Sequence, residues 1–89
     1  MKHKKEIIEG QNPFETGLTT SYLRYDSLEL FLNGLSTGLG NQSMRDEEKD
    51  RPQLAELGER AVKKIEEATE IVAKMWKVSE PRMKDEDKL

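Results

Sequence analysis

The chain has 89 residues, of which 37% are charged and 34% are hydrophobic. A chain of this length forms one domain and buries only ~60% of the surface that it exposes when unfolded. It contains no cysteine, which excludes disulfides and thiolate metal sites, and His3 is its only histidine. We therefore expect a single small domain over residues 1–89, with a thin core that gains stability from self-association and with no metal or cofactor.

Charge and hydropathy also limit where the protein acts. The net charge of -3 argues against general binding to nucleic acid or to anionic membranes. No run approaches the ~18 apolar residues of a membrane span. The basic start at residues 1–5 is followed by Ile7 and Ile8 and then by Glu9, so it lacks the apolar stretch of a signal peptide. We expect a cytoplasmic protein without a membrane contact.

The N-terminal part precedes a first helix. Residues 1–17 are interrupted by a glycine and a proline, and we expect this segment to be weakly ordered. Asp26 and Glu29 have the spacing of a capping box, which predicts a short helix over about residues 27–37. Leucines and tyrosines recur at helical spacing before that point, so a start as early as Thr19 stays open.

Three closely spaced glycines predict where the first helix ends. Gly34, Gly38 and Gly40 are beside two asparagines, and these residue types favour a helix C-cap followed by a turn. The residues after them are polar and highly charged. We therefore predict a connector over residues 38–50.

The strongest feature is a long amphipathic helix over about residues 52–78. Asp50 is its predicted N-cap, and Pro52 falls in the first turn, where its missing N–H costs nothing. The pair Glu80-Pro81 is expected to stop the helix, which leaves residues 80–89 as a charged, disordered tail.

The long helix carries a wide apolar stripe that suits a helical bundle. A heptad frame with Leu54 at position a puts most apolar residues at a and d, with further apolar residues on both flanks. The helix spans about 40 Å and the short helix about 16 Å, so the short helix cannot cover it. We predict a helical hairpin that self-associates into a dimeric or tetrameric bundle, in which an antiparallel two-fold pairing of the long helices would let the same patch serve both chains. The residues expected at the oligomer interface are Leu54, Leu57, Ala61, Ile65, Ala68, Val72, Met75 and Trp76.

An alternative arrangement begins with a strand. Thr and Tyr residues favour a strand over residues 19–25, and a strand followed by two helices resembles the ribbon-helix-helix family of dimeric DNA-binding repressors and antitoxins. The resemblance implies paired strands in the major groove, with Arg24 as the candidate DNA contact. The acidic composition and the predicted 38–50 connector depart from that family.

No residue pattern indicates catalysis. The segment Gly34 to Gly40 lacks the lysine of a phosphate-binding loop, and no nucleophile is framed with a base. The sequence predicts a non-enzymatic interaction or accessory protein that forms homo-oligomers and can bind a larger protein partner.

Overall fold

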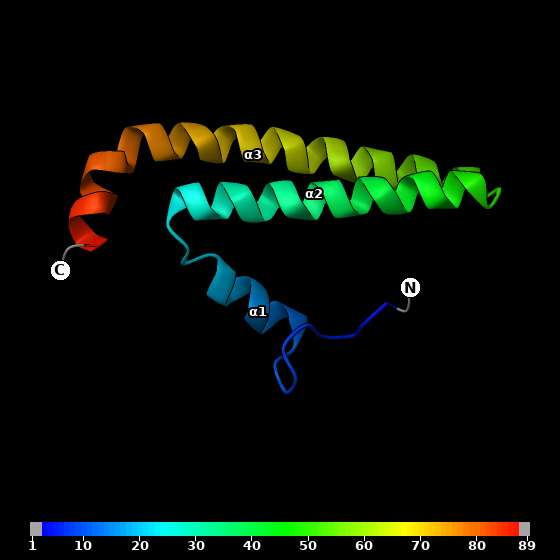
Figure 1. The fold of residues 1–89 in the computed structure, drawn as a ribbon, viewed down its shortest axis with the longest axis horizontal. Helices are drawn as coiled ribbons and strands as arrows, with labels where there is room; N and C mark the ends of the chain where they lie inside the picture. The colour runs from blue at the N-terminus through cyan, green and yellow to red at the C-terminus, as the bar shows by residue number, and fades with distance from the viewer. Residues whose placement is uncertain (1–2, 88–89) are drawn as a thin grey trace.

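The protein folds as an antiparallel helical hairpin with a short helix at its N-terminal side. The computed structural model describes residues 3–87, with side chains as far as residue 82. That part contains α1 (Pro13–Thr20), α2 (Tyr25–Glu48) and α3 (Pro52–Asp87), and it contains no strand. α2 and α3 lie side by side along their length, whereas α1 projects from the beginning of α2 (Figure 1). The predicted mainly α fold is confirmed for these residues.

α1 is a short helix that is capped by its own sequence and packs little. Asn12 is the N-cap: its Oδ1 accepts a hydrogen bond from the Glu15 N–H at 2.9 Å, and its Nδ2 donates to Glu15 Oε1 at 3.0 Å. The apolar side chains of Phe14 and Leu18 remain 74% and 50% exposed. Residues 3–12 form no helix or strand, and residues 1 and 2 lie outside the described part of the chain.

Residues 19–25 do not form a strand. They contain the end of α1, a turn and the first residue of α2. In the turn, the N–H of Tyr22 donates to the carbonyl of Thr19 at 3.2 Å, and the N–H of Leu23 donates to that of Thr20 at 3.0 Å. The strand on which the ribbon-helix-helix alternative depends is therefore absent.

α2 is much longer than the predicted helix over residues 27–37. It begins at Tyr25 with Arg24 as N-cap, so Asp26 lies in its first turn and is not its cap. It continues to Glu48, and most of the predicted connector over residues 38–50 is helical. Each interior glycine costs about 1 kcal/mol relative to alanine, and packing against α3 along the whole of α2 outweighs that cost.

The chain reverses direction at a residue that is not glycine. Asp50 has a φ of 58°, and its N–H donates to the carbonyl of Glu47 at 3.1 Å. The N–H of Arg51 donates to the carbonyl of Asp46 at 2.8 Å, which completes a Schellman motif. Asp50 thus ends α2, and its predicted role as the N-cap of α3 is wrong.

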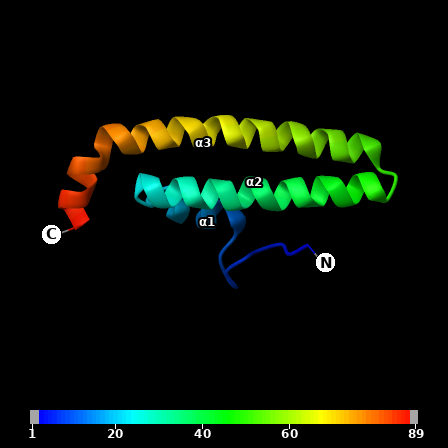
Figure 2. The same ribbon diagram turned by 45° about the horizontal axis from the view of Figure 1, so that its top comes forward.

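α3 passes through Pro81 and continues to Asp87, so the predicted helix stop at Glu80-Pro81 is wrong. The predicted disordered tail over residues 80–89 is wrong for residues 80–87, which are helical. Residues 88 and 89 lie outside the described part. The helix bends towards its C-terminal end (Figures 1 and 2). Pro81 removes one backbone hydrogen bond there, and the Ser79 hydroxyl donates to the carbonyl of Met75 at 2.7 Å, which also favours a bend.

α2 and α3 pack through a regular heptad seam, which we call the inner seam. Its residues are buried or half-buried at every a and d position of the hairpin. From α3 it contains Ala55, Gly58, Val62, Ile65, Thr69, Val72, Trp76 and Ser79. From α2 it contains Tyr25, Glu29, Leu32, Ser36, Leu39, Ser43 and Asp46. The correct heptad frame of α3 therefore starts one residue later than the predicted frame, and α2 covers a face of α3 that we expected to need a second chain.

Candidate interaction surface

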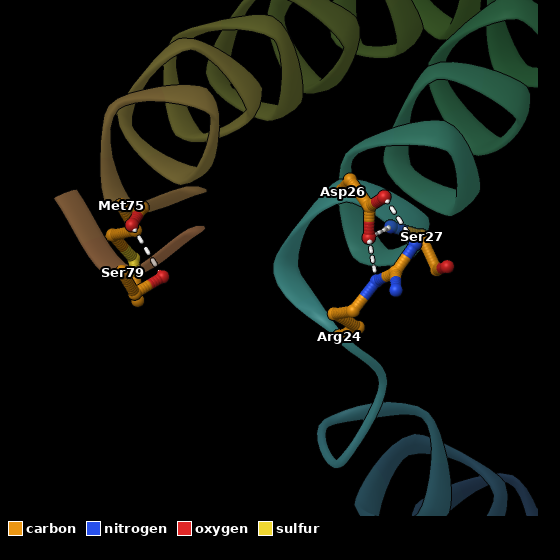
Figure 3. Close-up of polar contacts among 5 residues, drawn as sticks. All are labelled: Arg24, Asp26, Ser27, Met75 and Ser79. Carbon is orange, nitrogen blue, oxygen red and sulfur yellow. Dashed lines mark hydrogen bonds and ion pairs between the residues drawn. The ribbon is translucent and has the colours of Figure 1, made fainter. Parts of the chain in front are cut away.

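At the open end of the hairpin, Arg24 forms an ion pair with Asp26 at the start of α2 and a cation–π contact with Trp76 of α3. Arg24 Nε and Nη2 donate to the two carboxylate oxygens of Asp26 at 2.7 and 2.8 Å, and the N–H of Ser27 donates to Asp26 Oδ1 at 2.9 Å (Figure 3). The hydrogen bonds from Arg24 hold the pKa of Asp26 below its ordinary value. The Arg24 guanidinium also lies over the Trp76 ring, 5.2 Å from its centroid. Arg24, the candidate DNA contact, is thus engaged within the hairpin.

The predicted interface residues divide into two groups. Ile65, Val72 and Trp76 belong to the inner seam and are half-buried against α2 of the same chain. The other five are exposed on α3: Leu54, Leu57, Ala61, Ala68 and Met75. The eight predicted residues therefore belong to two neighbouring apolar seams of α3, one exposed and one covered by α2. The sequence prediction combined them because their heptad frames differ by only one residue.

The exposed residues form a second apolar surface that both helices share. In α3 they occupy heptad positions c and g, one flank of the inner seam. In an antiparallel pair, the g positions of both helices line the same side. We call this surface the open face: the half-buried Leu28 and the exposed Phe31 and Leu35 from α2, and the exposed Leu54, Leu57, Ala61, Ala68, Ile71, Met75 and Val78 from α3.

The α3 row of the open face is apolar along nearly its whole length. Ile71 is 59% exposed and Val78 is 85% exposed, although both are large aliphatic residues. Lys64 is the one charged residue in the α3 row of c and g positions within residues 54–78, and its Nζ lies 3.6 Å from Glu67 Oε2. Sequence reasoning missed the α2 contribution to the open face, and the signal that could have found it is the spacing of three and four residues between Leu28, Phe31 and Leu35.

A hollow of about 390 Å³ opens on this surface near the end of the hairpin that carries Trp76. Ile71, Met75 and Val78 form its apolar wall, and Tyr25, Lys74 and Ser79 complete its lining. Three of the six lining residues belong to the open face. The hollow is therefore shaped to take an apolar side chain from another helix.

A second depression, of about 470 Å³, lies at the hairpin turn and has a different character. Its charged lining includes Arg45, Lys49 and Arg51, with Asp46 as the acidic member. Arg51 Nη1 lies 3.7 Å from Asp46 Oδ1, so part of this positive charge is balanced within the chain. Among the described residues, no three His, Asp or Glu side chains are grouped so that they could hold a metal ion.

No helix in the described part of the chain is long and apolar enough to cross a membrane. The sequence matches no protein-family model, no curated protein and no solved structure.

Proposed function

We propose that this chain is a non-enzymatic, cytoplasmic interaction protein that self-assembles through the open face into a helical bundle. The observation that carries the proposal is the second heptad seam on α3, which stays exposed after α2 has covered the first. Exposed apolar surfaces of this extent on a small domain are typical of protein–protein contacts. A helix with two apolar seams has two neighbouring helices in a bundle, and the hairpin supplies only one of them.

The proposed contact accounts for how so small a chain is stabilised. Among the described side chains, Ala55 is the only buried hydrophobic one, at 4% exposure. Burial of apolar surface stabilises a fold by roughly 25 cal/mol per Å². Covering Leu54, Leu57, Ile71 and Met75 in a bundle would therefore add a core that the hairpin lacks. A larger protein partner could bind the surface that remains on the assembled bundle.

Sedimentation equilibrium at micromolar concentration tests the proposal. The wild-type protein should sediment as a dimer or tetramer, and Leu57→Glu should shift it towards monomer because it buries a charge in the contact. Met44→Glu is the matched control: Met44 is 63% exposed, similar to Leu57 at 51%, but it lies on α2 outside the open face. A folded wild-type monomer at all concentrations would rule out self-assembly. Cell fractionation tests the cytoplasmic location.

A further inference from the structure

We propose that the occupant of the open face is a second copy of this chain, placed so that α2 of each copy lies against α3 of the other and both hairpin turns are at the same end. This inference rests on the proposed self-assembly and specifies its geometry. It differs from the antiparallel α3–α3 pairing that the sequence also allows. Both arrangements cover the open face, and the charges beside it distinguish them.

The first observation concerns size. The open face runs for ~36 Å along α3, and the side of the hairpin that carries it is two helices wide, about 20 Å, which gives a footprint of roughly 700 Å². Beyond Leu35, the α2 half of that footprint contains Gly38, Gln42 and Arg45. Stable interfaces bury about 800 Å² on each partner. Two open faces placed together would thus form a contact of the size that a specific dimer requires.

The second observation concerns the charged row that borders the open face on α3. This outer row, at heptad position f, contains Gln53, Arg60, Glu67 and Lys74. An antiparallel α3–α3 pairing that aligns the whole apolar stripe puts Leu54 opposite Val78. That register brings Arg60 close to Lys74 of the second copy and Glu67 close to Glu67. Like charges in such flanking positions disfavour a pairing.

The corresponding outer row of α2 carries no charge over most of its length. Its members at position f are Ser27, Gly34 and Asn41, followed by Glu48 in the last turn of the helix. When α3 lies against α2 of a second copy, its charged outer row meets these small neutral residues. The long Arg60 and Lys74 side chains can then cover the edge of the contact without like-charge repulsion. The charge pattern therefore favours the α2–α3 arrangement.

The third observation is the hollow beside Met75. In the proposed dimer the two-fold axis is parallel to the helices, so residues at one height in a hairpin meet residues at the same height in the other. Phe31 lies at the height of Ile71, and helical side chains lean towards the N-terminus of their helix. That lean directs the Phe31 ring of one copy towards the hollow formed by Ile71, Met75 and Val78 of the other. Phe31 is 43% exposed in the single chain and becomes the central anchor of the dimer.

Two measurements test this arrangement. The chain has no cysteine, so Lys49→Cys accepts a single spin label at the hairpin turn. Pulsed electron paramagnetic resonance on the dimer should give a label separation of about 20–25 Å, because both turns are at one end. An antiparallel α3–α3 dimer would give ~40 Å, since α2 is ~36 Å long. A separation near 40 Å would overturn this inference and leave self-assembly intact, whereas a monomer without any dipolar signal would overturn both.

The second measurement compares neighbouring side chains. Phe31→Glu should weaken the dimer at least 100-fold in dissociation constant, because the two-fold axis removes the contact twice. Leu30→Glu should change it less than threefold, since Leu30 is 73% exposed and points about 100° away round the helix. Circular dichroism confirms that both variants remain helical. Equal weakening by the two variants, or none by Phe31→Glu, would overturn the role of Phe31.

Discussion

Gly58 of α3 lies directly against Ser43 of α2, with no room between them for a side chain. A β-carbon added at Gly58 would overlap the Ser43 hydroxyl and press on the Ser43 β-carbon. Ser43 itself is only 3% exposed. The two helices therefore approach each other closely near the turn, where the inner seam contains small residues.

The close contact predicts opposite effects for two glycine substitutions. Gly58→Ala should lower the free energy of unfolding by about 1–2 kcal/mol, because overpacking outweighs the better helix propensity of alanine. Gly34→Ala should raise it by about 0.5–1 kcal/mol, since nothing lies within 4 Å of the added carbon. Urea denaturation at one fixed protein concentration measures both. If Ser43→Ala did not relieve part of the Gly58→Ala loss, overlap with the Ser43 hydroxyl would not be its cause.

The turn residue Asp50 predicts a stabilising substitution. Its φ of 58° is unfavourable for a residue with a β-carbon and free for glycine. Asp50→Gly should raise the free energy of unfolding by roughly 0.5–1 kcal/mol. Asp50→Ala should lower it, because alanine keeps the β-carbon and lacks the polar side chain that tolerates this conformation. Thermal melts of the wild type and the two variants give their order of stability. An alanine variant as stable as the glycine variant would contradict this prediction.

The ion pair between Arg24 and Asp26 predicts a dependence on pH. The pKa of Asp26 is lowered from its ordinary value of 3.8, chiefly by the hydrogen bond from Arg24. A lowered folded-state pKa stabilises the fold above the unfolded pKa, and this stabilisation is lost as the pH falls through the folded value. Asp26→Asn should therefore be less stable than the wild type above about pH 5, and the difference should disappear in stronger acid.

The same ion pair can be measured directly by titration. The Asp26 carboxyl carbon, followed by NMR, should titrate below 3.8 in the wild type. Arg24→Gln should move the midpoint upwards, because the charged donor is gone. An unchanged midpoint in Arg24→Gln would show that another group lowers the pKa.

The cap at Asn12 predicts an effect confined to α1. An isolated helix of eight residues is marginal in water, and its N-cap contributes about 1 kcal/mol. Asn12→Ala should reduce the helical Cα chemical shifts of residues 13–20 and leave the melting of the hairpin unchanged, since Phe14 and Leu18 are largely exposed. Asn12→Asp keeps the acceptor oxygen and should preserve α1. A lower melting temperature in Asn12→Ala would show that α1 stabilises the hairpin.

Local signals in the sequence identified some features correctly and misled at others. The start of α3 at Pro52 and its amphipathic character follow from propensity and periodicity, and both agree with the structure. The ends of α2 did not follow. Gly34, Gly38 and Gly40 indicate a helix end, yet the helix passes through all three because α3 packs against its whole length.

The composition and the 3.5-residue periodicity of the chain by themselves determined a mainly α protein with too little core for its apolar surface. Only the tertiary structure decided which of the two adjacent heptad seams of α3 is covered by α2 of the same chain. Ala55 and Gly58 let α2 approach closely, whereas Leu54 and Leu57, one residue away in the frame, would hold it off. Near the turn, small residues therefore pack the hairpin, and Leu54 and Leu57 are left on the open face together with Ile71 and Met75 further along α3.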